Sequence, residues 1–225
     1  MTGHWSGVGV GPGDPELMTI KAARRLLECD VIAIPHENRE QCTAYQIAVL
    51  AVPEIEKKPC LCLPMPMTKD PQVLERSHQE AAERTADCLR RGENVAFLTL
   101  GDATIYSTCL YVMERLRADG FSVELLNGIP SFCAAAARLG IGLVNGTEEL
   151  HVIPASYQIE EALSLPGVKV FMKAGRRLAH LRERLIACGA QVWMVENCGM
   201  EGERVMTGAE AIPEDAGYFS LLLVR

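Results

Sequence analysis

Val95-Ala96-Phe97-Leu98-Thr99-Leu100-Gly101-Asp102 is the stretch that decides the fold class of this 225-residue chain. Its first six residues are apolar at nearly every position, as in a strand of a parallel sheet that is buried on both faces. Gly101-Asp102 then ends the strand, and residues 106–118 have the pattern of a helix. A buried strand, a glycine turn and a helix in succession predict an α/β fold that binds ligands at the carboxyl ends of its strands.

The same alternation of strand and helix extends in both directions from this stretch. Strands are predicted at 5–10, 31–34, 60–63, 95–100 and 122–126, and helices at 19–29, 43–52, 71–91, 106–118 and 131–139. Beyond residue 139 the pattern loosens, with strands expected at 150–153, 168–172, 191–195 and 220–224 and helices near 158–164 and 176–188. We therefore expect two α/β domains, residues 1–126 with a parallel sheet and residues 127–225.

The composition argues against several classes of protein. A net charge of −7 without a basic run disfavours a nucleic-acid partner, whose binding needs clustered Lys and Arg. No apolar run reaches the roughly 18–20 residues that a membrane span needs, and residues 1–5 lack the pattern of a signal peptide. The nine cysteines are an odd number, which favours free thiols. We expect a cytoplasmic protein without a metal site.

A glycine-rich loop, Gly7-Val-Gly-Val-Gly-Pro-Gly-Asp-Pro15, follows the first predicted strand. Glycines at a strand end allow a sharp turn and a close approach of a ligand to the main chain. Dinucleotide-binding folds need the spacing G-x-G-x-x-G, which fails here because Pro12 or Asp14 occupies the third glycine position. An oxidoreductase that binds NAD is therefore disfavoured. The alternative is a plain tight turn in which Asp14 or Thr19 caps the next helix.

Three further segments place small or polar residues after predicted strands. The first is Gly101-Asp102, the second is Gly128-Ile-Pro-Ser131, and the third is a pair of stretches in the second half of the chain, Met172-Lys173 and Glu196-Asn-Cys-Gly199. A backbone-rich turn with one carboxylate suits a ligand that bears an amine, hydroxyls and a positive centre. Each segment also has a purely structural interpretation, since Asp102 and Ser131 are good helix caps and Met172 fits a core position.

Taken in order, these segments resemble the tetrapyrrole methylases, the class III S-adenosylmethionine-dependent methyltransferases. Gly9-Val-Gly-Pro-Gly-Asp-Pro15 is similar to the opening loop of the family, Leu100-Gly-Asp102 to its central turn and Gly128-Ile-Pro-Ser131 to its inter-domain segment. The resemblance covers essentially the whole chain. It implies two α/β domains with a cofactor trough between them, and a homodimer.

The resemblance also implies site residues. S-adenosylmethionine, which leaves as S-adenosylhomocysteine, would be bound by Pro12, Leu100, Gly101, Asp102, Ile105, Ser131, Phe132, Met172 and Cys198. A tetrapyrrole substrate would lie near Gly11, Gly13, Tyr106, Arg76, Lys173 and Arg176, with a solvated surface charge as the alternative for each arginine and lysine. Asp102, Tyr106 or water would receive any proton that the substrate loses. No Ser–His–Asp or Cys–His pattern is present, so no covalent enzyme intermediate is expected.

The residues after Gly101-Asp102 indicate a branch of the family. Ile105-Tyr-Ser-Thr108 resembles the enzymes that methylate carbon 20 of precorrin-2 or cobalt-precorrin-2 in cobalamin biosynthesis, as do residues 64–70 and 218–220. Ala103 stands where most relatives carry Pro, which is similar to enzymes with a cobalt-containing substrate. The alternatives are methylation of another ring position, or of RNA or a diphthamide precursor, and a relative that binds the cofactor without catalysis.

Overall fold

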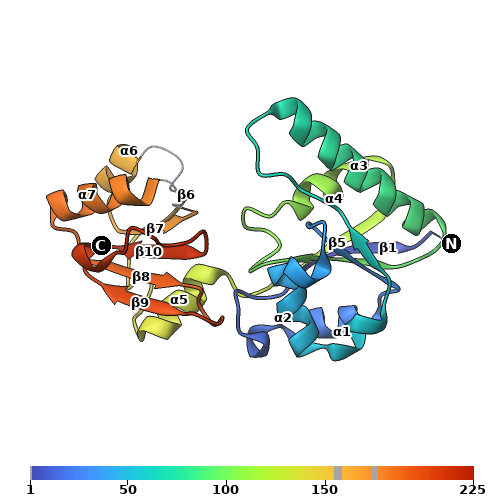
Figure 1. Cartoon of the computed structure of the whole chain (residues 1–225), viewed down its shortest axis with the longest axis horizontal. Coiled ribbons are helices and arrows are strands. Elements are labelled where there is room, and N and C mark those ends of the chain that lie inside the picture. The colour runs from blue at the N-terminus through green and yellow to red at the C-terminus, as the bar shows by residue number, and fades with distance from the viewer. Residues whose placement is uncertain (1, 155–158, 174–176) are drawn as a thin grey trace. The chain divides into compact units, whose positions relative to one another are not determined.

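The computed structural model describes residues 2–154, 159–173 and 177–225 and divides the chain into two compact units (Figure 1). The first unit spans Met1–Pro130 and the second Ser131–Arg225. The expected boundary, after residue 126, lies four residues before this division. Each unit consists of one sheet with helices, as the alternation in the sequence predicts.

The first unit contains a five-stranded sheet in which every paired strand is parallel. Its strands are β1 (His4–Gly9), β2 (Val31–Ile34), β3 (Cys60–Cys62), β4 (Val95–Thr99) and β5 (Ser122–Leu126). The order in the sheet is β3-β2-β4-β1-β5. From β1 the chain crosses β4 to reach β2, and from β4 it crosses β1 to reach β5. The connections that leave β1 and β4 run in opposite directions along the sheet. The topological switch point therefore lies between these two neighbouring strands.

Helices cover both faces of this sheet. They are α1 (Ile20–Glu28), α2 (Thr43–Ala51), α3 (Pro71–Arg90) and α4 (Cys109–Ala118), with short 3-10 helices η1 (Pro15–Leu17), η2 (Arg39–Gln41) and η3 (Pro53–Lys57). Alternate strand residues point to opposite faces. Ile32 and Ile34 thus pack with α1 and α2, whereas Val31 and Ala33 pack with α3 and α4. Burial on both faces explains the continuous apolar strands in the sequence.

Local signals set where two of these helices begin. Asp70 caps α3, since its side chain accepts a hydrogen bond of 2.9 Å from the backbone N–H of Gln72, and Pro71 supplies the fixed φ of the first turn. Helix α4 begins at Cys109 and not at residue 106 as predicted. Tyr106 has a φ of 49°, a left-handed conformation that an α-helix excludes.

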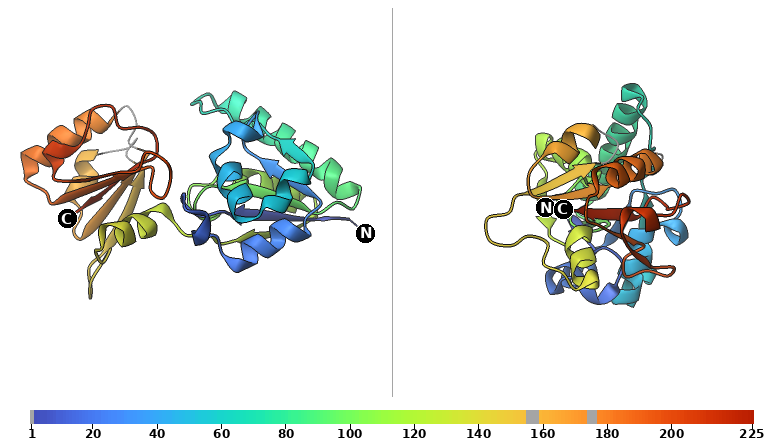
Figure 2. Two further views of the ribbon diagram at one scale, coloured as in Figure 1. Left: turned by 60° about the horizontal axis from the view of Figure 1, so that its bottom comes forward. Right: turned by 90° about the vertical axis from the view of Figure 1, so that its left-hand side faces the viewer.

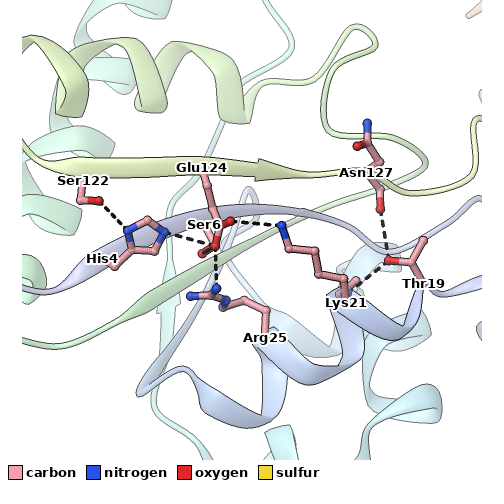
Figure 3. A network of polar contacts seen from close by, with 9 residues as sticks. His4, Ser6, Thr19, Lys21, Arg25, Ser122, Glu124 and Asn127 are labelled. Carbon is pink, nitrogen blue, oxygen red and sulfur yellow. Dashed lines mark hydrogen bonds and ion pairs between the residues drawn. The ribbon is translucent and has the colours of Figure 1, made fainter.

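The edge strand β5 is joined to β1 and α1 through Glu124 (Figure 3). Arg25 Nη2 lies 2.7 Å and Lys21 Nζ 3.5 Å from the Glu124 carboxylate. His4 Nε2 lies 3.2 Å away, and the Ser6 hydroxyl donates to the same oxygen at 3.2 Å. Burial raises the pKa of Glu124, but Arg25, Ser6, Lys21 and His4 together outweigh it, so the pKa lies below its ordinary value.

The second unit contains a mixed five-stranded sheet in the order β6-β7-β10-β8-β9. Its strands are β6 (Leu150–Pro154), β7 (Val168–Met172), β8 (Val192–Glu196), β9 (Arg204–Thr207) and β10 (Ser220–Val224). β6 and β7 are parallel, whereas β10 is antiparallel to both β7 and β8. β9 was not predicted, because its residues are alternately half-buried and exposed and it lies at the sheet edge.

The helices of the second unit are α5 (Ser131–Leu139), α6 (Ile159–Ser164) and α7 (Leu178–Cys188), with the 3-10 helix η5 (Ala209–Ala211). α6 and α7 pack their apolar residues on one face of the sheet, around Phe171 and Leu222. Figure 2 shows α5 on the other side of this sheet from α6 and α7. Among the helices of the described ranges, none is long and apolar enough to cross a membrane.

Candidate functional site

Three turns of the first unit meet at the switch point of its sheet. The turns follow β1, β4 and β5, and they touch one another through main-chain atoms. Gly11 and Gly101 form an isolated antiparallel bridge, with N–H to carbonyl hydrogen bonds of 3.2 Å and 2.8 Å. Val10 N also donates to the Thr99 carbonyl at 3.0 Å. The turns after β1 and β4 are therefore held as one main-chain platform.

Glycine is required where these turns come closest. A Cβ on Gly128 would lie 2.1 Å from the Gly101 carbonyl oxygen, and one on Gly9 would lie 2.6 Å from the Gly128 nitrogen. Gly11 and Gly101 have φ values of +85° and +72°, which other residues adopt only with strain. The glycines quoted in the sequence thus serve a contact between three chain segments, which no single motif reveals.

Asp102 fastens the third turn to the other two. Its Oδ1 accepts a hydrogen bond of 2.7 Å from Thr104 N and a very short one from the Thr104 hydroxyl. Its Oδ2 accepts hydrogen bonds of 3.1 Å from Asn127 Nδ2 and from Gly128 N. A carboxylate has about four acceptor positions, so the protein itself occupies those of Asp102.

This environment makes the Asp102 carboxylate a weak base. Burial raises the pKa of Asp102, but the hydrogen bonds from Thr104, Asn127 and Gly128 lower it by more, so the pKa lies below its ordinary value. A buried hydrogen bond of 2.8 Å between the Thr99 and Ser107 hydroxyls also connects the two ends of the loop that contains Asp102. The geometry therefore favours a role for Asp102 in fixing the turns.

The structure brings most of the predicted residues of the first unit to this edge. Gly11, Pro12, Gly13, Gly101 and Asp102 are buried, Leu100 and Ile105 are half-buried, and Tyr106 is exposed in the same turn. Both main-chain hydrogen-bonding groups of Gly11 are engaged by Gly101. Arg76 lies apart from these turns, exposed in the first half of α3.

In the second unit, the predicted residues Met172, Lys173 and Cys198 lie at one edge of the sheet. Met172 ends β7 and pairs with Leu221, while Cys198 follows β8, whose last residue pairs with Ser220. The start of β10 therefore lies between the two turns. Burial lowers the pKa of Lys173 and raises that of Cys198.

Left-handed backbone conformations occur in turns of both units. In the described ranges, the non-glycine residues with positive φ are Tyr106, Lys173 and Asn197, at 49°, 56° and 51°. Tyr106 and Lys173 are themselves predicted site residues, and Asn197 directly precedes another, Cys198. Such conformations cost about 1–3 kcal/mol and collect at functional sites.

A buried carboxylate also fastens the loop before β10. Glu196 Oε2 lies 2.5 Å from Arg204 Nε, and Glu196 Oε1 accepts a very short hydrogen bond from Gly217 N. Tyr218 and Phe219, in an edge-to-face arrangement 5.3 Å apart, follow directly and stay exposed. The anchors at Glu196 and Gly217 were not predicted, because they pair residues 21 positions apart.

The remaining predicted residues lie elsewhere in the second unit. Ser131 and Phe132 begin α5, where Ser131 is half-buried and Phe132 buried. Arg176 lies outside the described residues. Asn127 was missed as a partner of Asp102, and the only signal for it was its position before the Gly128-Ile-Pro-Ser131 segment.

The parallel sheet with glycine turns at its switch point and the second mixed sheet define a two-unit α/β protein, with a candidate ligand site at the turns of the first unit. The family model of the tetrapyrrole (corrin/porphyrin) methylases matches residues 6–212. The chain belongs to this family.

Curated relatives fall into two groups by length. The chain is 34% identical to the cobalamin biosynthesis protein CobIJ of Mycobacterium tuberculosis strain H37Rv, over 97% of the chain, and spans 45% of that relative. It is 33% identical to the precorrin-2 C(20)-methyltransferase of Sinorhizobium sp, over 99% of the chain and 95% of the relative. It is also 33% identical to the probable cobalt-precorrin-2 C(20)-methyltransferase of Methanocaldococcus jannaschii, over 97% and 94%.

Solved structures share the fold. The cobalt precorrin-4 methyltransferase CbiF has a TM-score of 0.77 at 17% identity, over 98% of this chain and 94% of that one. The uroporphyrin-III C-methyltransferase of Thermus thermophilus complexed with S-adenyl homocysteine has a TM-score of 0.73 at 20% identity, over 99% and 97%. The predicted fold class is thereby confirmed.

Proposed function

We propose that this protein transfers a methyl group from S-adenosylmethionine to carbon 20 of precorrin-2 or cobalt-precorrin-2, in the biosynthesis of the corrin ring of cobalamin. The observation that carries the proposal is the likeness, along nearly the full length of both chains, to two relatives named for this reaction. Relatives named for other ring positions are less similar. The precorrin-4 C(11)-methyltransferase of Pseudomonas aeruginosa is 28% identical over 60% of the chain.

The chemistry of the turns suits this cofactor. The segments 9–13, 101–105 and 127–130 contain no Lys or Arg, and their one carboxylate is that of Asp102. A pyrophosphate would lack a cation there, whereas a ligand with a sulfonium and an ammonium group meets a negative potential. In the first unit, the residues that would contact it are Pro12, Leu100, Gly101 and Ile105. The candidates that the second unit carries are Ser131, Phe132, Met172 and Cys198.

When bound, S-adenosylmethionine supplies an electrophilic methyl group, and the protein supplies position and electrostatics. Hydrogen bonds within the protein hold the platform of Gly11, Gly101 and Gly128 in place, so little reorganisation is needed when the ligand binds. Asp102 acts as a positioning residue that holds these turns together. Tyr106 stands exposed in the same turn and remains, with water, the candidate to receive the proton that carbon 20 loses.

The substrate carries carboxylates, and cationic side chains of the protein would bind them. Lys173, directly after β7, is one candidate for such a contact, and burial lowers its pKa. Arg76 is an exposed cation on α3 and could serve the same role without a desolvation cost.

The reaction is tested with methyl-labelled S-adenosylmethionine and precorrin-2, with and without cobalt. Label at carbon 20, together with S-adenosylhomocysteine, is the expected result, and the preferred substrate identifies the metal state. Label at another ring carbon would replace this proposal with another ring position. Cofactor binding without any S-adenosylhomocysteine would identify a relative that does not catalyse the transfer.

We also propose a cytoplasmic location and a homodimer. All nine cysteines are free thiols, as in a reducing compartment. The homodimer is an implication of the family resemblance, and light scattering of the purified protein measures it. A monomer at micromolar concentration would contradict it.

A further inference from the structure

Of the five histidines, His36 is the one at the carboxyl edge of the parallel sheet, two residues after the end of β2. The others lie elsewhere: His4 begins β1, His78 lies within α3, His151 lies in β6 and His180 lies in α7. His78 stacks on Tyr111 and the other three lie beside glutamates, so all four have structural partners. His36 was not among the predicted site residues.

The parallel pairing of β2 with β4 places His36 at the same edge of the sheet as the glycine platform. Ala33 of β2 pairs with Phe97 of the neighbouring strand β4. β2 ends at Ile34 and β4 at Thr99, so His36 and Gly101 each lie two residues beyond the end of neighbouring parallel strands. His36 is half-buried there. It therefore belongs to the edge at which this fold binds ligands.

A main-chain hydrogen bond decides which ring nitrogen of His36 can donate. Asn38 N lies 3.0 Å from His36 Nδ1. A backbone N–H can only donate, so Nδ1 is the acceptor and the hydrogen of the neutral ring is on Nε2. Asn38 Oδ1 in turn accepts a hydrogen bond of 2.7 Å from Glu40 N, which fixes the turn that leads into η2. His36 thus presents a donor at Nε2, while its lone pair at Nδ1 is engaged by Asn38 N.

Arg39, the nearest cation along the chain, has other partners and is not available as a donor at this edge of the sheet. Arg39 Nε lies 3.0 Å from Glu40 Oε1, and Arg39 Nη1 donates to the Glu56 carbonyl at 3.3 Å. Its guanidinium also lies over the ring of Tyr45, 5.7 Å from the centroid. Arg39 is thus engaged on the side of α2. Within the described residues, the hydrogen bond of the His36 ring is the one at Nδ1, and Nε2 makes none.

We propose that His36 Nε2–H donates a hydrogen bond to a peripheral carboxylate of the tetrapyrrole, and so orients the macrocycle at the switch point. The inference rests on the proposed function, because it needs a ligand with carboxylates at this edge. His36 is a residue for substrate orientation, and it transfers no proton.

Two substitutions separate the two ring nitrogens. His36→Gln places an amide N–H near the position of Nε2, whereas His36→Asn keeps a polar group near Nδ1 and loses the distal donor. Absorbance titrations measure the Kd for precorrin-2 and cobalt-precorrin-2, and calorimetry measures the Kd for S-adenosylhomocysteine. His180→Gln, on α7 beside Glu160, is the matched histidine control.

We expect His36→Asn and His36→Ala to weaken tetrapyrrole binding roughly tenfold, as for the loss of one hydrogen bond to a charged group. His36→Gln should stay within about threefold of the parent, and the Kd for S-adenosylhomocysteine should be unchanged in all variants. Equal binding by His36→Asn and the parent would overturn the assignment, as would a His36→Gln variant as weak as His36→Ala. If the parent binds neither tetrapyrrole, the proposed function itself fails, which is a separate result.

Discussion

The Asp102 carboxylate accepts a hydrogen bond of 3.1 Å from the backbone N–H of Gly128, and so joins the turn after β4 to the turn after β5. Asn127 Nδ2 donates to the same oxygen at 3.1 Å. Because Gly101 is also bridged to Gly11, this contact completes a closed set of three turns at the switch point. The proposed cofactor site is therefore preorganised by main-chain contacts.

Substitution of Asp102 by Asn should weaken both folding and cofactor binding. The new amide has one acceptor oxygen and one NH₂ group. In either orientation the NH₂ group would face an N–H donor, that of Thr104 or that of Gly128, and one hydrogen bond would be lost. We expect the free energy of unfolding to fall by about 2 kcal/mol. The Kd for S-adenosylhomocysteine should rise about tenfold. Urea denaturation and calorimetry measure the two effects.

Asp119→Asn is the control for this variant, because Asp119 is exposed after the end of α4. Its stability and its affinity should equal those of the parent. If Asp102→Asn also binds S-adenosylhomocysteine as the parent does, Asp102 does not hold the site together.

Substitution of Gly128 by Ala tests the close approach of the turns. The added Cβ would lie 2.1 Å from the Gly101 carbonyl, a backbone atom that cannot move without breaking the bridge to Gly11. We expect a loss of at least about 3 kcal/mol in the free energy of unfolding, or a failure to accumulate folded protein.

Gly120→Ala separates steric contact from backbone strain. Gly120 has a φ of +83° but no atom within 4 Å of its added Cβ. The free energy of unfolding of Gly120→Ala should fall by about 1 kcal/mol, which is the cost of the backbone strain alone. Equal losses for the two variants, measured by urea denaturation, would show that the turns do not meet as described.

Substitution of Glu124 by Gln should destabilise the first unit in a way that depends on pH. The pKa of Glu124 is lowered in the folded protein, so its charge stabilises the fold above about pH 4.3, the pKa of an unfolded glutamate. This contribution is lost as the pH falls through the lower folded pKa. We expect a difference of about 1 kcal/mol between variant and parent at pH 7.

The difference should shrink towards zero as the pH falls below 4, as followed by thermal unfolding monitored by circular dichroism. Glu114→Gln, on the exposed side of α4, provides the reference for a glutamate outside such a cluster. A Glu124→Gln variant whose deficit persists unchanged at pH 3 would refute an origin in the carboxylate charge.

Substitution of Glu196 by Gln should loosen the loop that carries Tyr218 and Phe219. It removes the charge that pairs with Arg204 at 2.5 Å and weakens the acceptor for Gly217 N. We expect a loss of about 2 kcal/mol in stability. A rise of several-fold in the Kd for S-adenosylhomocysteine should accompany it, since the loop lies beside the turn of Cys198. Glu201→Gln, at an exposed position, should change neither quantity.

Several elements could be predicted from the sequence because their signals are local. The strand β7 and the helix α5 were predicted with the bounds that the structure gives them. A continuous apolar strand and an amphipathic helix each record the burial of their own residues. The strand β9 and the late start of α4 were missed, since an exposed edge strand and the left-handed Tyr106 leave no periodic signal.

The sequence by itself determined the α/β class, the glycine and aspartate positions of the turns and the family resemblance. Only the tertiary structure decided that Gly9, Gly101 and Gly128 touch, that the protein occupies the acceptor positions of Asp102, and that His36 lies at the same edge of the sheet as Gly101. The physical reason is that burial and turn propensity act on neighbouring residues along the chain. Strand order and main-chain contacts between turns join residues more than a hundred positions apart, such as His4 and Ser122, and they exist only when the sheet has formed.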